Sequence, residues 1–80
     1  MGEQDMAKIV KVCFRKPKEG EKVKSFNCTQ LLDVILNEFP TMTVNKSTRI
    51  YLGRAMSKLG FEKTDHGHIT FYKAVPRKAS

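Results

Sequence analysis

Tryptophan is absent from this 80-residue sequence, and cysteines and long apolar runs are scarce. The two cysteines, Cys13 and Cys28, have no partners at metal-ligand spacing, so we interpret both as small buried apolar residues. No apolar stretch approaches the ~20 residues that span a bilayer, and residues 1–6 lack the charged-then-apolar pattern of a secretory signal. We therefore expect a cytoplasmic protein with no membrane partner.

Acidic residues are scarce in the second half of the chain. Residues 41–80 contain eight Lys/Arg and two Asp/Glu, a balance of +6, whereas residues 1–40 contain seven and six, a balance of +1. Together these give a formal charge of +7, which attracts polyanions such as nucleic acid, acidic protein surfaces or anionic lipid. Charge alone does not choose among them, and an ordinary solubilising surface is the alternative.

The length of the chain limits it to one modest hydrophobic core, because 80 residues with 40% apolar content have no room for a second. We expect a flexible N-terminus over residues 1–7, one domain over residues 8–75 and a basic tail over residues 76–80. The run Ile9–Phe14 is rich in β-branched and aromatic residues, which predicts a strand. Residues 16–24 mix charges with Pro17 and Gly20, which predicts an exposed connector.

Two helices follow. Asn27 is placed to cap the first, Gln30 completes a capping box and Pro40 ends the pattern. The second begins at Asn45 or Ser47 and ends before Gly60. In the first, one buried face is indicated by apolar residues at helical spacing, at Cys28, Leu31, Leu32, Ile35, Leu36 and Phe39. In the second, one side of the helix carries Thr48, Leu52, Ala55, Met56 and Leu59. Residues 41–45 between them form either a turn or a single-turn helix.

The last part of the chain predicts a β-hairpin with a short strand at 61–63, a turn at 64–68 containing Gly67, and a longer strand at 69–75. The fold class expected from this order is α+β, as a winged helix-turn-helix. Its elements would be an N-terminal strand, two or three helices and a C-terminal hairpin that serves as the wing.

In helix-turn-helix domains that bind DNA, the second helix enters the major groove and flanking elements contact the backbone. Because Leu52 faces the core, helical periodicity turns a polar side of the second helix to solvent. The candidate nucleic-acid-binding residues on this helix are Lys46, Ser47, Arg49, Ile50, Arg54, Ser57 and Lys58. Those on the hairpin are Lys63, His66, His68 and Lys73.

Three of these positions have specific interpretations. Arg54 is the favoured base-edge or phosphate contact, because a guanidinium pairs bidentately with guanine or phosphate. Ile50 either meets a thymine methyl or a protein partner, or packs under the turn at residues 42–44. Gly53 costs a helix interior about 1 kcal/mol, so a close backbone approach by the first of the two helices or by DNA would explain it.

Catalysis, metals and cofactors are not expected. His66 and His68 flank one glycine without a ligand set around them, and no positioned nucleophile accompanies them. No G-x-x-x-x-G-K-[ST] phosphate loop is present, so no NTPase activity is assigned. Further cations precede residue 20, and they have two interpretations. They either extend the positive surface or form a solvated charged face in which Glu19 and Glu21 offset part of the charge. These cations are Lys8, Lys11, Arg15, Lys16 and Lys18.

About residues 12–75 carry a family resemblance, most specifically Leu52-Gly53-Arg54-Ala55-Met56-Ser57-Lys58-Leu59-Gly60-Phe61, together with Phe14–Glu21 and Tyr72. This pattern resembles an uncharacterised C-terminal domain of bacterial mobile-element proteins of the primase-helicase and VirE-like type. It is also similar to the winged-helix tail of phage and poxvirus-type primase-helicases, which implies nucleic-acid handling. The motif residues implied are Gly53, Arg54, Lys58, Gly60 and Phe61.

The function expected is therefore non-catalytic nucleic-acid binding, with DNA favoured over RNA and a monomer in isolation. The alternative is a protein-docking module that contacts other domains of a longer parent protein, since one scaffold hosts many functions.

Overall fold

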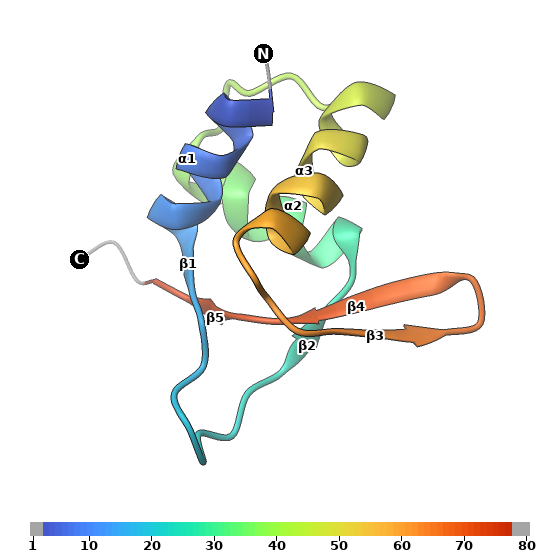
Figure 1. The fold of residues 1–80 in the computed structure, drawn as a ribbon. Helices are drawn as coiled ribbons and strands as arrows, with labels where there is room; N and C mark the ends of the chain where they lie inside the picture. The colour runs from blue at the N-terminus through green and yellow to red at the C-terminus, as the bar shows by residue number, and fades with distance from the viewer. Residues whose placement is uncertain (1–2, 78–80) are drawn as a thin grey trace.

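Helices form one side of the molecule and short strands form the other (Figure 1). The structure is a computed structural model that describes residues 3–77 of the chain. Within these residues it has an α+β architecture of three helices and two small antiparallel sheets. The elements are α1 (Glu3–Cys13), β1 (Phe14–Arg15), β2 (Ser25–Phe26), α2 (Cys28–Glu38), α3 (Lys46–Lys58), β3 (Lys63–His66), β4 (Ile69–Lys73) and β5 (Val75–Pro76).

The N-terminal segment is a helix, so the strand predicted at Ile9–Phe14 is wrong for all but its last residue. Met6, Val10 and Cys13 follow helical spacing and are fully buried, and this burial outweighs the β propensity of the β-branched residues. Residues 3–7, expected to precede the domain, belong to α1. The folded unit therefore begins earlier than predicted.

The two predicted helices are confirmed as α2 and α3. Each begins with a capping box, because the side chain of Asn27 accepts from the Gln30 N–H and that of Asn45 accepts from the Thr48 N–H. The end of α3 is a Schellman motif in which Gly60 has a φ of +86°. No helix forms in the connector at residues 39–45, where a single-turn helix was one alternative.

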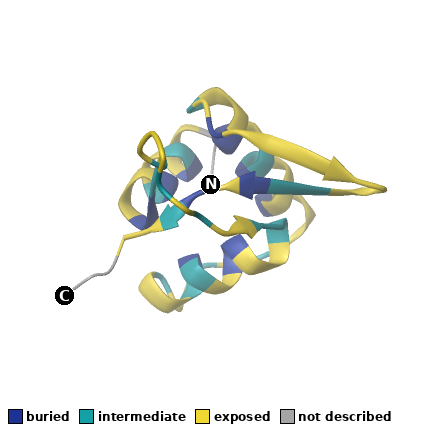
Figure 2. Ribbon diagram, turned by 90° about the horizontal axis from the view of Figure 1, so that it is seen from below, coloured by how far each residue is buried: buried dark blue, intermediate teal, exposed yellow. Residues whose placement is uncertain are grey.

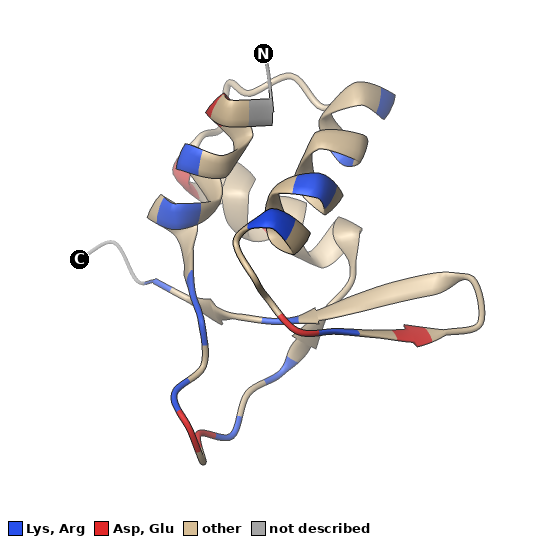
Figure 3. Ribbon diagram, viewed as in Figure 1, with Lys and Arg blue, Asp and Glu red and all other residues tan. Residues whose placement is uncertain are grey.

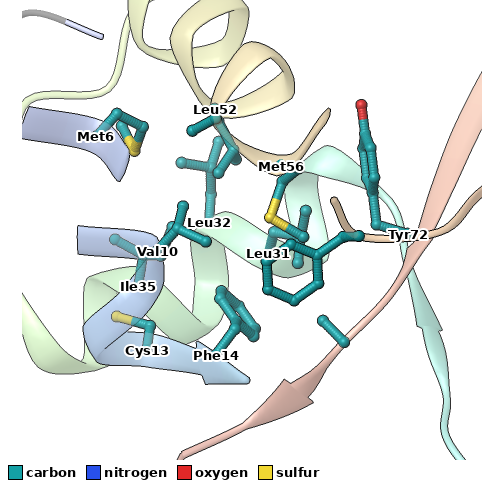
Figure 4. Packing of buried hydrophobic residues seen from close by; sticks show 13 residues of the cluster. Met6, Val10, Cys13, Phe14, Leu31, Leu32, Ile35, Leu52, Met56 and Tyr72 are labelled. Carbon is teal, nitrogen blue, oxygen red and sulfur yellow. The ribbon is translucent and has the colours of Figure 1, made fainter. Parts of the chain in front are cut away.

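The core lies between the three helices and the start of β1, and the hairpin closes its lower side (Figure 4). α1 packs along α3, and α2 contacts both. The buried apolar residues come from every part of the chain: Met6, Val10, Cys13, Phe14, Leu31, Leu32, Ile35, Leu52, Ala55, Met56, Phe61, Tyr72 and Ala74. Burial raises the pKa of the Cys13 thiol to about 11, so this cysteine is an inert apolar core residue as expected.

The larger sheet has the strand order β2-β4-β3, with β4 in the middle. β3 and β4 pair from Lys63↔Tyr72 to His66↔Ile69, so the turn contains only Gly67 and His68 and is shorter than predicted. Gly67 has a φ of +66° and no other residue of the turn has a positive φ, the pattern of a type II′ turn whose twist matches the strands.

The smaller sheet joins the segment that follows α1 to the last part of the described chain. β1 and β5 pair in antiparallel register, with Phe14↔Pro76 and Arg15↔Val75. The Arg77 N–H donates to the Cys13 carbonyl at 2.7 Å. Pro76 and Arg77, assigned to a basic tail by the sequence, are thus attached to the end of α1, and residues 78–80 of that tail lie outside the described residues.

No helix within residues 3–77 combines the length and the apolar character needed to cross a membrane.

Candidate nucleic-acid interface

The candidate residues on α3 lie on its outer side. Thr48, Leu52, Ala55 and Met56 turn into the core, as the periodicity predicts. The remaining polar and charged positions are exposed to solvent, together with one isoleucine: Lys46, Ser47, Arg49, Ile50, Arg54, Ser57 and Lys58. α3 therefore presents one long, uncovered side. Seen from below, the exposed residues lie on the outside of the molecule and the buried ones toward its middle (Figure 2).

Charged residues occupy the two flanks of this outer side. At 3.6 residues per turn, Arg54 lies about 140° around the helix from Arg49. Between them lies a strip that includes Ile50, Gly53 and Ser57, with Lys46 at its N-terminal end as its charged residue. After its first residue, the exposed side of α3 thus has small or apolar residues in the middle and guanidinium groups on both flanks.

Acidic residues are missing from this region. No Asp or Glu occurs between Glu38 and Glu62, and Figure 3 shows Lys and Arg positions along α3 without an acidic one. Within residues 3–77 the ion pairs are Arg15–Glu21 and Lys73–Glu62, so none of the α3 cations is neutralised by a described residue. The positive charge of α3 is available to a ligand.

A groove of about 370 Å³ runs beside the Arg49 flank. Its walls are α3, the first turn of α2 and the hairpin, and no acidic residue lines it. Arg49 Nη1 lies 3.5 Å from Thr29 Oγ1 across this groove, and His68 reaches it from the hairpin turn. Of the hairpin candidates, His68 is the one that lines the same groove as an α3 candidate.

The other hairpin candidates divide between two faces of the sheet. Lys63 pairs with the buried Tyr72 and shares its helix-facing side. His66 lies on the opposite face, where its ring meets the Phe71 ring edge-on at 5.5 Å. Lys73 lies on that face too, by strand alternation, 3.6 Å from Glu62 Oε2. His66 and Lys73 therefore turn away from α3.

The hairpin region is also balanced in charge. Lys63 and Lys73 are offset by Glu62 and Asp65, and Asp65 accepts a hydrogen bond from Thr70 at 2.7 Å. The basic excess of the C-terminal half is consequently concentrated on α3 and not on the hairpin. The net charge of the sequence does not reveal this distribution.

Tyr72 is a residue of the site that sequence reasoning missed. It is 8% exposed, lines the groove, and its hydroxyl points away from the core side chains (Figure 4). Burial raises the pKa of the Tyr72 phenol, and a hydrogen bond with Ser57 opposes that rise. The sequence signal was the strand alternation that places Tyr72 with Ala74, both of which face the core.

Tyr72 is also the residue whose side chain lies next to Gly53. A Cβ built on Gly53 would lie 3.5 Å from the Tyr72 hydroxyl, with no atom of α2 within 4 Å. The explanation of Gly53 by helix packing is therefore wrong. Ile50 is 46% exposed and stands apart from the buried cluster, so its packing under the turn at residues 42–44 is wrong as well.

Within residues 3–77, no three His, Cys, Asp or Glu side chains gather to hold a metal ion. Cys28 is half-buried at the first turn of α2 and lines the groove as a free thiol.

Comparisons of the chain with models of known protein families, with curated proteins and with solved structures found no match. The resemblance to the C-terminal domain of mobile-element primase-helicases thus stays a prediction.

Proposed function

We propose that this chain is a winged helix-turn-helix domain that binds nucleic acid, DNA in preference to RNA, and that it has no catalytic activity of its own. The order of elements supports the fold. A helix, two short strands, two capped helices, a hairpin and a short last strand follow one another, and the hairpin strand β4 lies between β2 and β3. In this fold β3 and β4 form the wing beside α3.

The single observation that carries the proposed function is the outer side of α3. The major groove is about 12 Å wide and admits an α-helix. On the outer side of α3, the strip of Ile50, Gly53 and Ser57, with Lys46 at its N-terminal end, would face the base edges. Cations on the two flanks then reach the phosphates of the two strands that border the groove, as Arg49 and Arg54 can. Without acidic residues on α3, this approach meets no repulsion.

The hairpin has a smaller part in the proposed interface. His68 and Lys63 are on the side of α3, and they are suited to sugar-phosphate oxygens. Since the hairpin region has balanced charge, we expect it to orient the domain and to add little to the salt dependence of binding.

Fluorescence anisotropy with labelled duplex and single-stranded oligonucleotides of mixed sequence tests the proposal. We expect the wild-type protein to bind the duplex with an affinity that falls steeply with salt. Removing two phosphate contacts with Arg54→Gln/Lys58→Gln should reduce the slope of log K against log salt by about 1.8, from ~0.9 per contact.

Lys22→Gln/Lys24→Gln is the matched control, because it removes the same charge from exposed positions in the connector between β1 and β2. We expect it to leave the slope close to that of the wild type. Failure of the wild type to bind either kind of oligonucleotide with salt sensitivity overturns the proposal. Equal slopes for the α3 variant and the control remove α3 from the interface.

The second candidate function is protein docking, favoured by the exposure of Ile50 and the half-burial of Tyr51 on the same helix. The other domains of a longer parent of primase-helicase type would be the partners. Ile50→Glu should then abolish capture of the partner while Arg54→Ala leaves it intact. For DNA binding we expect both variants to bind more weakly, because Arg54→Ala removes a charge contact and Ile50→Glu places a carboxylate against the base edges.

A further inference from the structure

A second cationic groove lies on the other side of the molecule from the hairpin tip, where α1 meets the end of α3. It has a volume of about 260 Å³ and a floor formed by Phe14, Leu59 and Phe61. Four cationic side chains and no acidic one line it, namely Lys11, Arg15, Lys16 and Arg77. This set includes residues that the sequence left open between a positive surface and a solvated face.

The fold gathers these cations from distant parts of the chain. Pairing of β1 with β5 brings Arg77 to the end of α1, where its Nε donates to the Phe14 carbonyl at 3.2 Å. Lys16 extends over the end of α3, since its Nζ lies 2.9 Å from the position of a Cβ on Gly60. Lys11 is in the last turn of α1. The groove is therefore a product of tertiary structure.

Two of the four cations are already engaged and two are free. Arg15 makes a bidentate pair with Glu21, at 2.9 and 2.7 Å. Arg77 is held by the Phe14 carbonyl. Neither Lys11 nor Lys16 forms an ion pair with a residue in the described part of the chain. The groove thus combines fixed guanidinium groups with two ammonium groups that have donors to spare.

We infer that this groove binds phosphate groups of the nucleic-acid backbone, as an extension of the α3 interface. The inference rests on the proposed function. Leu59, the C-cap of α3, forms part of the groove, so a backbone that contacts Lys58 passes directly into it. Like-charged side chains that converge without acidic partners favour an anion, and phosphate oxygens accept from ammonium and guanidinium groups alike.

The experiment compares Lys11→Gln/Lys16→Gln with the wild type and with the Lys22→Gln/Lys24→Gln control on one long duplex. Loss of two phosphate contacts lowers the salt slope by about 1.8, so between about 50 and 200 mM salt the wild type should lose about 12-fold more affinity than the variant. Thermal unfolding of each variant by circular dichroism shows whether it is folded.

The outcomes separate the two proposals. If the wild type binds, and the α3 variant loses slope while Lys11→Gln/Lys16→Gln behaves like the control, the groove proposal is overturned and the α3 interface stands. Both lysines also lie near helix C-termini, where a cation stabilises the helix dipole. A lower melting temperature with an unchanged salt slope therefore assigns them that structural role and rejects phosphate binding. A wild type without salt-sensitive binding overturns both proposals.

Discussion

Two glycines, Gly53 inside α3 and Gly60 just beyond its end, should respond to the same substitution with opposite signs. Gly53 lies inside the helix with ordinary helical backbone, and a Cβ added there would meet the Tyr72 hydroxyl at 3.5 Å, a normal van der Waals distance. Alanine avoids the helix cost of glycine, which is about 1 kcal/mol. We therefore expect Gly53→Ala to stabilise the fold by about 0.5–1 kcal/mol.

Gly60 is the matched control. Its φ of +86° is the left-handed conformation, and a Cβ there would lie 2.9 Å from Lys16 Nζ. The flexible lysine can move aside, but the backbone cannot leave the Schellman motif without losing the hydrogen bond from the Phe61 N–H to the Met56 carbonyl. Gly60→Ala should consequently destabilise the fold by about 1–2 kcal/mol.

Thermal unfolding followed by circular dichroism measures both effects. For a domain of this size, 1 kcal/mol corresponds to a shift in Tm of about 4–8 °C. Gly53→Ala should raise Tm by several degrees and Gly60→Ala should lower it. A fall in Tm for Gly53→Ala would refute the reasoning, because it would mean that the hairpin packs against α3 more tightly than an alanine permits. If duplex affinity also falls in this more stable variant, DNA approaches the helix at Gly53.

Two further predictions concern stability. Met6→Ala should lower the free energy of unfolding by about 2–5 kcal/mol, because Met6 is fully buried. Urea titration measures this change, and an unchanged midpoint would contradict the inclusion of residues 3–7 in the folded unit. The hydrogen bonds from Arg15 and the Lys18 N–H hold the pKa of Glu21 at about 2, below its ordinary 4.5. Ionised Glu21 therefore stabilises the fold above about pH 4.5, and this stabilisation is lost as the pH falls toward 2. Glu21→Gln should lack that component, and Tm curves for the two proteins that run parallel across this pH range would contradict it.

Local signals in the sequence were sufficient for α2 and α3. Asn27, Asn45 and Gly60 act within one helical turn of their own position, so their side chains and backbone conformations can be interpreted without the rest of the fold. The hairpin was predicted for the same reason, through Gly67. What the sequence did not fix was the length of the turn, since β3 extends to His66 only because β4 pairs with it along its whole length.

α1 was not predicted, because the local strand propensity of its residues pointed to another structure. Ile9, Val10 and Val12 favour a strand by propensity, yet the chain buries Met6, Val10 and Cys13 on one side of a helix. That spacing of four and then three residues was present in the sequence and was the competing signal. Packing along α3 decided between the two, and packing is a property of the folded chain.

For the candidate site, the exposure of the α3 residues could be predicted from helical periodicity. The positions of the hairpin residues could not, because they depend on the register in which β3 pairs with β4. Strand alternation alone could not say which side of β4 faces the core, because both sides carry apolar residues. The burial of Tyr72 settles it and turns His66 and Lys73 away from α3. The cationic groove at Lys11 and Arg77 was beyond prediction, because nothing in the sequence pairs residue 14 with residue 76.

That pairing has a kinetic consequence. Contacts between residues so far apart in sequence require closure of a loop that spans almost the whole described chain, and such contacts slow folding. β1 has no strand partner until the segment at Val75–Pro76 has been synthesised. A nascent chain shorter than this can form its capped helices, but it lacks the strand that brings Arg77 to Lys11, so the contribution of this groove to polyanion binding should appear only after Arg77 has been synthesised.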